Sequence, residues 1–149
     1  MGAAGEDDAE WLRTGDLGFL DAAGELFITG RIKEVVIIRG ANHYPQDIED
    51  TVQSSHPAIR RHAGAAFTIA DDAKGEQLIV VQEVERTERH RIEPAQLTAH
   101  IREAIVLEHD IVPYEIALLR PGALPKTTSG KIQRAHARQL WLTGALERL

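Results

Sequence analysis

The chain has 149 residues, a length that suits one domain with its own hydrophobic core. Hydrophobic residues make up 43% and charged residues 27%, which excludes collagen-like and disordered chains, and the net charge of −6 argues against a nucleic-acid partner. No apolar run reaches the roughly 20 residues of a membrane helix, and the acidic start lacks a signal-peptide pattern. We therefore expect a cytoplasmic protein without a membrane span. The lack of cysteine excludes disulfides, zinc thiolate sites, iron–sulfur clusters and cysteine nucleophiles.

The N-terminal part of the chain predicts β-structure. Apolar runs at 18–20 and 25–29 flank a turn sequence with Asp21 first and Gly24 last, which predicts a β-hairpin. The β-branched run 35–38 predicts a buried strand, and we expect residues 42–44 to pair with it after a glycine turn.

Proline marks the start of two predicted helices. Pro45 suits the first turn of a helix that we expect to run to about residue 55. From Pro94 to about residue 108 the apolar positions Leu97, Ile101, Ala104, Ile105 and Leu107 follow helical spacing. A third helix is expected from residue 132 to about residue 142.

Three more strands are predicted in the second half of the chain. Residues 63–69 and 77–84 are separated by a polar turn that ends in glycine, which predicts an antiparallel pair. Residues 116–119 predict a short strand. Taken together, the elements predict an α+β fold, in which an N-terminal β-hairpin is followed by a small mixed or antiparallel sheet covered by helices.

The loop sequence LPKTTSGKI at 124–132 invites comparison with a phosphate-binding P-loop. A P-loop would need glycine in place of Pro125 and serine or threonine in place of Ile132, so this reading is excluded. Lys131 remains as a long cation beside hydroxyl residues, able to reach a phosphate or a carboxylate. From this chemistry alone, an exposed structural lysine is the alternative.

The sequence has no metal or hydrolase motif. Its seven histidines form no H-E-x-x-H motif and no i, i+4 pair backed by a carboxylate, so we predict no metal site. G-x-S-x-G is absent, and Ser129 lacks the strand-to-helix setting of a hydrolase nucleophile.

Four segments stand out in chain order: TGD at 14–16, GRIKE at 30–34, GANHYPQDIE at 40–49 and PKTTSGKIQR at 125–134. Together they resemble the C-terminal end of the adenylate-forming (ANL) superfamily of acyl- and aryl-activating ligases. Within the superfamily, the run IRGANHYPQDIE at 38–49 resembles the fatty acyl-AMP ligases more closely than the acyl-CoA synthetases. The resemblance implies that residues 1–30 are a lead-in and hairpin from the end of a large N-terminal domain. Residues 31–149 would then form the mobile C-terminal domain.

The resemblance also implies roles for single residues. Asp16 is expected to accept hydrogen bonds from the ribose hydroxyls of ATP, and Arg31 to contact the ribose or the phosphates. For Arg31, a surface ion pair with Glu34 or Glu25 is the alternative. Lys33 matches the hinge about which the C-terminal domain turns. Lys131 matches the catalytic lysine, which also binds the nucleotide.

A further implied site is the loop that carries Gly40, Asn42 and His43. After the domain turns, this loop is expected to face the phosphopantetheine arm of the acceptor. Glycine would allow the acceptor to approach closely.

The implied reaction activates a fatty acid with ATP to acyl-AMP and passes the acyl group to an acyl carrier protein or polyketide synthase. Mg²⁺ would be bound through the nucleotide and the large N-terminal domain of the same enzyme, which is the implied partner. We expect the isolated chain to be folded but inactive. The alternatives are an acyl-CoA synthetase, a peptide-synthetase adenylation domain fragment, or a non-catalytic module that docks a carrier protein.

Overall fold

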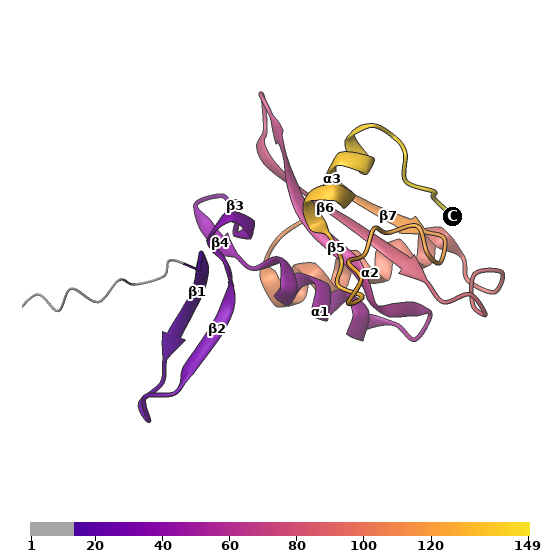
Figure 1. Ribbon diagram of the computed structural model, residues 1–149. Coiled ribbons are helices and arrows are strands. Elements are labelled where there is room, and N and C mark those ends of the chain that lie inside the picture. Colours follow the sequence, from indigo (N-terminus) through magenta and orange to yellow (C-terminus); the bar gives the residue numbers. More distant parts are fainter. Residues whose placement is uncertain (1–13) are drawn as a thin grey trace, which may run out of the picture.

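A β-hairpin projects from a body of helices and strands in the computed structural model, which describes residues 14–149 (Figure 1). The hairpin pairs β1 (Asp16–Leu20) with β2 (Leu26–Arg31). In its turn the Asp21 carboxylate accepts hydrogen bonds from the backbone N–H groups of Ala23 and Glu25, both at 2.9 Å. The predicted hairpin is confirmed, and both strands run two residues further toward the body than the apolar runs predicted. The lead-in predicted for the first dozen residues lies outside the described residues.

A short 3₁₀ helix, η1 (Ile32–Glu34), follows the hairpin and was not predicted. Next come β3 (Val36–Ile38) and β4 (Ala41–His43), joined by a two-residue turn in which Arg39 and Gly40 both have positive φ. The strand pair is confirmed, but Tyr44 lies outside it because its carbonyl caps the following helix. The prediction of a buried strand is wrong for Ile37, which is 54% exposed.

The body is built on a mixed sheet of β5 (Ile59–Asp71), β6 (Gly75–Val84) and β7 (Glu115–Leu119). β6 lies in the centre, antiparallel to β5 and parallel to β7. α1 (Pro45–Ser55) and α2 (Pro94–His109) cover one face, and α3 (Arg134–Leu142) covers the other (Figure 1). The predicted α+β architecture is confirmed.

Helix α2 buries fewer residues than its apolar spacing predicted. Leu97, Ile101 and Ile105 are buried against the sheet, whereas Leu107 is 77% exposed. Leu107 follows Ile105 by two residues, about 200° around the helix, so it cannot share the buried face. The helix ends where Asp110 adopts positive φ.

The last helix starts later than predicted, because Ile132 forms a β-bridge with Lys126 instead of entering α3. After α3 the chain returns along β7, where the Leu149 N–H donates to the Leu118 carbonyl at 2.9 Å. This return of the chain was not predicted.

One arginine joins α3 to two distant segments. Arg134 donates two hydrogen bonds to Glu49 on α1, at 2.6 and 2.8 Å, and one to Glu34 in η1, at 2.8 Å. We call these three residues the Arg134 clasp. The hydrogen bonds to Glu49 raise the pKa of Arg134 above its ordinary value, against the opposing effect of burial. The clasp fixes where the chain enters α3, directly after the loop that carries Lys131.

We predict that Arg134→Met lowers the free energy of unfolding by about 1–3 kcal/mol, because two partly buried carboxylates lose their partner. The matched control is Arg138→Met on the same helix, since the exposed Arg138 side chain donates, among residues 14–149, only to the Thr68 carbonyl. We expect the control to change stability by less than about 0.5 kcal/mol. Denaturant unfolding curves measure both, and equal losses in the two variants would contradict a special role for the clasp.

Candidate functional site

A groove of about 820 Å³ lies where the hairpin, α1 and the loop before α3 approach one another. Asp16 and Arg31 line it from the hairpin, and Lys131 lines it from the loop. The structure therefore brings together the three residues that the sequence predicted to contact a nucleotide. The wall also includes Glu34, Gln46, Glu49, Gly64, Gln82 and Arg134.

The loop at 125–133, here called the lysine loop, is closed by its own backbone. The Gln133 N–H donates to the Pro125 carbonyl at 3.0 Å, and the Thr127 N–H donates to the Lys131 carbonyl at 2.8 Å. Gly130 turns the chain with φ of +85°. The Thr127 hydroxyl accepts a hydrogen bond from the Lys131 N–H at 3.1 Å. These contacts order the backbone of the loop and leave the Lys131 side chain exposed.

The charges along the groove are mostly paired. Arg31 Nε lies 3.7 Å from Asp16 Oδ1, because the strand register places these two residues opposite each other. The alternative pairing of Arg31 with Glu34 or Glu25 is not seen, and Glu34 is paired with Arg134. Among the arginines and lysines that line the groove, Lys131 alone has no acidic partner within residues 14–149. Its positive charge is available to an anionic ligand.

The other predicted site residues lie outside the groove. Lys33 is exposed in η1, between the hairpin and the body. Gly40 and Asn42 lie in the β3–β4 pair and are exposed, and the positive φ of Gly40, +79°, is what its turn requires. His43 is half-buried, and its burial, followed by the nearby His109, lowers its pKa from the ordinary value of a histidine.

Sequence reasoning missed a buried carboxylate next to the lysine loop. Glu83 on β6 is fully buried, and its two oxygens accept hydrogen bonds from Arg60 and from the Leu124 N–H, both at 2.9 Å. The signal in the sequence was a glutamate shortly after the apolar run 78–81, at the end of a predicted strand, which is a costly place for a charge.

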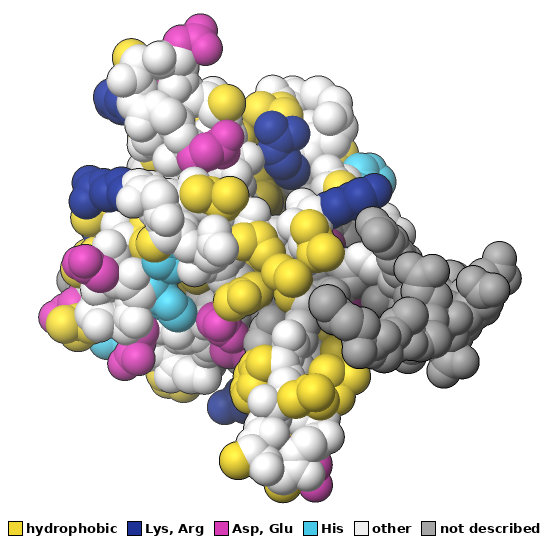
Figure 2. All heavy atoms as spheres, turned by 90° about the vertical axis from the view of Figure 1, so that its left-hand side faces the viewer, with side chains coloured by type: hydrophobic (Ala, Val, Ile, Leu, Met, Phe, Trp, Pro, Cys, Tyr) yellow, Lys and Arg dark blue, Asp and Glu magenta, His cyan; other side chains and the backbone are white. Residues whose placement is uncertain are grey.

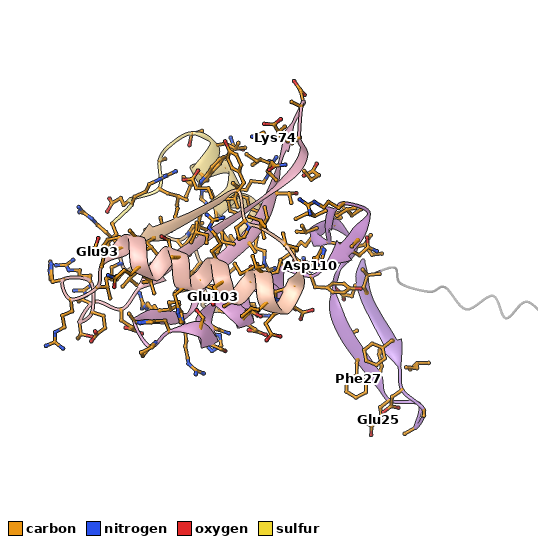
Figure 3. All side chains as sticks on the ribbon, turned by 180° about the vertical axis from the view of Figure 1, so that it is seen from behind. Glu25, Phe27, Lys74, Glu93, Glu103 and Asp110 are labelled. Carbon is orange, nitrogen blue, oxygen red and sulfur yellow. The ribbon has the colours of Figure 1, made fainter. Side chains whose placement is uncertain are left out.

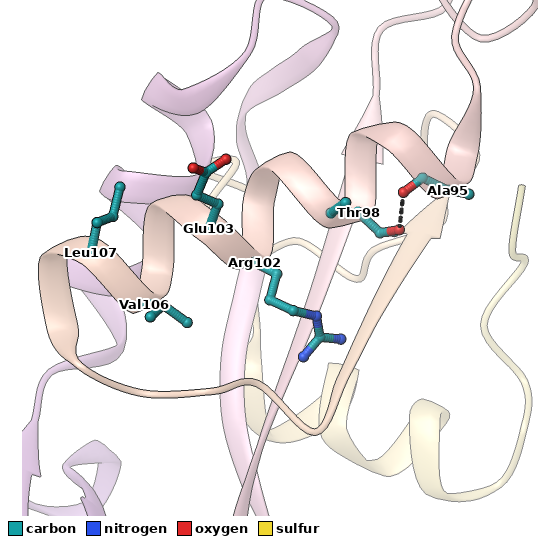
Figure 4. A pocket seen from close by; sticks show the side chains of 7 residues that line it. Ala95, Thr98, Arg102, Glu103, Val106 and Leu107 are labelled. Carbon is teal, nitrogen blue, oxygen red and sulfur yellow. Dashed lines mark hydrogen bonds between the residues drawn. The ribbon is translucent and has the colours of Figure 1, made fainter.

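A second hollow, of about 460 Å³, lies on the outer side of α2 (Figure 4). None of the predicted site residues lines it. The Thr98 hydroxyl there donates to the Ala95 carbonyl at 3.0 Å, within the helix itself. Within the described part of the chain, no group of three or more metal-ligating side chains could hold a metal ion.

None of the helices between residues 14 and 149 is long and apolar enough to cross a bilayer.

Known proteins match this chain closely. The medium-chain-fatty-acid–[acyl-carrier-protein] ligase JamA of Moorena producens is 53% identical over 141 residues, covering 94% of this chain and 23% of JamA. The long-chain-fatty-acid–AMP ligase FadD32 of Mycolicibacterium smegmatis is 39% identical over 160 residues, covering 94% of this chain and 25% of FadD32. A solved structure from work on fatty acyl-adenylate ligases of E. coli and L. pneumophila matches with a TM-score of 0.74 and 36% identity, covering 91% of this chain and 23% of that one.

The chain spans about a quarter of the length of these curated relatives. A family model described as "Disco-interacting protein 2-like, AMP domain" matches residues 33–149, which begin at Lys33 within η1 and include the β3–β4 pair and the lysine loop. The resemblance found in the four sequence segments is thereby confirmed. The chain belongs to the adenylate-forming superfamily, in this family of AMP domains.

Proposed function

We propose that the chain is the C-terminal domain of a ligase that activates a fatty acid with ATP to acyl-AMP and passes the acyl group to an acyl carrier protein. The observation that carries this proposal is Lys131, an exposed cation without an acidic partner among the described residues, on the same groove as Asp16 and Arg31. JamA, 53% identical, is named as a ligase with this kind of acceptor.

In the proposed first step, a fatty acid carboxylate attacks the α-phosphate of ATP and pyrophosphate leaves. Negative charge from the carboxylate and the phosphate meets at the reacting centre. Lys131 can lie against both groups as a compact point charge on a flexible stem, which stabilises the crowded charge and holds the reactants together. The ordered backbone of the lysine loop keeps the position from which the side chain reaches.

The Asp16 and Arg31 pair suits the ribose end of the nucleotide. A carboxylate has two acceptor oxygens, and Arg31 Nε lies 3.7 Å from Oδ1, which is too far for a hydrogen bond. The second oxygen can accept a hydrogen bond from a ribose hydroxyl. Mg²⁺ would come with the ATP phosphates and be held by the part of the enzyme outside this chain, where the acyl pocket would also lie.

The groove also supports a hinge at Lys33. Asp16 and Arg31 precede Lys33 in the chain, whereas the lysine loop follows it, so the two walls of the groove lie on opposite sides of this residue. A turn about Lys33 would move Lys131 away from Asp16 and Arg31. It would also reorient the β3–β4 pair, so that Gly40, Asn42 and His43 could face the acceptor arm.

The projecting hairpin supports a further domain that precedes the hinge. Phe19 and Phe27 stack with 5.3 Å between ring centroids and are 54% and 44% exposed. Phe27 lies toward the far end of the hairpin (Figure 3), and hydrophobic side chains gather along this projection (Figure 2). An isolated two-stranded hairpin is only marginally stable in water. Contact with a larger N-terminal domain would bury these side chains and stabilise the hairpin.

Other functions remain alternatives, and each has a discriminating substrate. An acyl-CoA synthetase would use coenzyme A as acceptor, and a peptide-synthetase adenylation domain would activate an amino acid. A module that only docks a carrier protein would need no free lysine beside Asp16 and Arg31, which is why we favour the ligase.

We predict that Lys131→Ala in the complete enzyme slows acyl-AMP formation about 10²–10³-fold, the usual effect of losing one positioned group at developing charge. ATP–pyrophosphate exchange measures this step. Transfer from preformed acyl-AMP should stay near the parent rate, because Lys131 has then turned away.

The matched control is Lys126→Ala, which removes another exposed lysine from the opposite side of the same loop. We expect the control to keep both rates. A parallel loss of both half-reactions in Lys131→Ala, with an unchanged melting temperature, would contradict this role.

We predict that Lys33→Pro impairs acyl transfer more than adenylation. Proline fixes its own φ and disfavours helical backbone at the residue before it, which here is Ile32 in η1. Lys33→Ala is the control, because it removes the charge and keeps the backbone freedom, and it should retain both half-reactions. If Lys33→Pro reduces both half-reactions equally, Lys33 is not the pivot.

We predict that the complete enzyme transfers its acyl group to a holo acyl carrier protein faster than to free coenzyme A. Mass spectrometry of the carrier protein and chromatography of acyl-CoA, run at equal acceptor concentration, compare the two products. Faster acyl-CoA formation would assign the protein to the acyl-CoA synthetases instead.

A further inference from the structure

Glu83 is a buried carboxylate to which neither the superfamily resemblance nor the proposed reaction assigns a role. Its side chain has no exposed surface, although it lies only one residue before the end of β6. Its Oε2 accepts a hydrogen bond from Arg60 at 2.9 Å, and its Oε1 accepts one from the backbone N–H of Leu124 at 2.9 Å. Both carboxylate oxygens are therefore in use.

Two neighbouring residues of the central strand β6 hold Arg60 in place. It lies where the pairing of β5 with β6 is irregular, between Ile59 and Gly64. The amide of the neighbouring Gln82, which is also buried, donates to the Arg60 carbonyl at 2.8 Å and to the Ala63 carbonyl at 3.0 Å. Consecutive residues of β6 thus hold the Arg60 backbone and its guanidinium.

The other partner of Glu83 leads directly to the lysine loop. Leu124 is buried in the core beneath α3 and is the residue immediately before Pro125. The Pro125 carbonyl then accepts the hydrogen bond from Gln133 that closes the loop. A displacement of Leu124 would therefore move the near end of the loop that carries Lys131.

We propose that Glu83 is a positioning residue for Lys131: its carboxylate fixes the Leu124 amide and so sets where the lysine loop leaves the sheet. The inference rests on the proposed role of Lys131 in acyl-AMP formation. A carboxylate suits this task because a hydrogen bond from an N–H to a charged acceptor is shorter and stronger than one to a neutral acceptor. Arg60 balances the charge, which makes its burial tolerable.

The loop then has an anchor at each end. Glu83 holds the residue before the loop through a backbone amide, and the Arg134 clasp holds the residue that follows Gln133. These anchors are independent, because Glu83 is on the central strand whereas Glu49 is on α1. The geometry of a catalytic group matters steeply, since a shift of about 1 Å can change a rate by about 10²-fold.

The test compares three variants of the complete enzyme. Glu83→Leu removes both acceptor oxygens, and Glu83→Gln keeps an oxygen that can still accept from Leu124. Val81→Ala is the stability control, because Val81 is fully buried on the same strand, two residues earlier, and contacts the same core. Hydrogen–deuterium exchange of the segment 124–133 reports loop order, and the two half-reactions are measured separately.

For Glu83→Leu we expect faster exchange at 124–133 and acyl-AMP formation slowed about 10–100-fold in kcat, with transfer from preformed acyl-AMP within about twofold of the parent. Glu83→Gln should recover most of the loss. Val81→Ala should lower the melting temperature without changing exchange at 124–133 or the ratio of the half-reactions.

The proposal is overturned if Glu83→Leu leaves the exchange of 124–133 unchanged, or if it reduces both half-reactions as a stability loss would. If Glu83→Leu does not fold, Glu83→Asp replaces it, because the shorter carboxylate keeps the charge but cannot hold Leu124 in the same place.

Lys131→Ala separates the hypothesis on Lys131 from the hypothesis on Glu83. If that variant forms acyl-AMP at the parent rate, the role of Lys131 fails and the proposal for Glu83 fails with it, whatever the exchange shows. If Lys131→Ala is slow and Glu83→Leu is not, only the role of Glu83 fails.

Discussion

Arg134 connects segments that lie far apart in the sequence. Its planar guanidinium donates to Glu49, 85 residues earlier, and to Glu34, 100 residues earlier. Glu49 Oε1 also accepts a hydrogen bond from the Ala66 N–H on β5 at 2.9 Å, so the clasp extends into the sheet. Lysine could not replace this arginine, because its single ammonium cannot make a forked contact with one carboxylate while it reaches a second. The clasp makes α1, the end of η1 and the start of α3 one unit with β5.

This unit separates two groups of charges, one on the hairpin and one on the body. The Asp16 and Arg31 pair is on the hairpin, before Lys33, while the clasp and the lysine loop are on the body. At an effective dielectric constant of about 20, two opposite charges attract by about 4 kcal/mol at 4 Å and by about 2 kcal/mol at 8 Å. A hinge motion of a few ångströms would therefore change the attraction of Lys131 for a bound anion substantially. Glu34, one residue after the proposed hinge at Lys33, is paired with Arg134, and this pair would keep η1 attached to α3 during such a motion.

Local sequence signals predicted the elements whose cause is local. Asp21 and Gly24 define the hairpin turn with their own groups, and Pro45 starts α1 at the predicted residue. The 3₁₀ turn at η1 and the irregular start of β5 were not predicted, since both depend on contacts across the fold. The start of α3 was placed two residues too early, because apolar spacing does not reveal the bridge between Ile132 and Lys126.

The site was predictable only in part for the same reason. Motif resemblance singled out Asp16, Arg31 and Lys131, and the fold places all three on one groove. Glu83 shares no segment with them, and its hydrogen bond to Leu124 spans 41 residues. A glutamate next to a buried apolar run indicates that a polar partner exists, but it does not identify that partner. That information lies in the parallel pairing of β6 with β7, which brings Glu83 opposite Leu119, five residues before Leu124.

The arrangement also separates the stability of the lysine loop from the function of its lysine. Backbone hydrogen bonds, the Thr127 hydroxyl and the two anchored ends order the loop. The Lys131 ammonium makes no ion pair with any described residue, so within residues 14–149 the fold does not depend on its charge. A cation held in a structural ion pair would first have to leave its partner before it could meet a substrate anion, and that step would oppose binding. An unpaired lysine has no such partner to leave. The hydrogen bonds that order its loop come from groups that take no part in the proposed reaction.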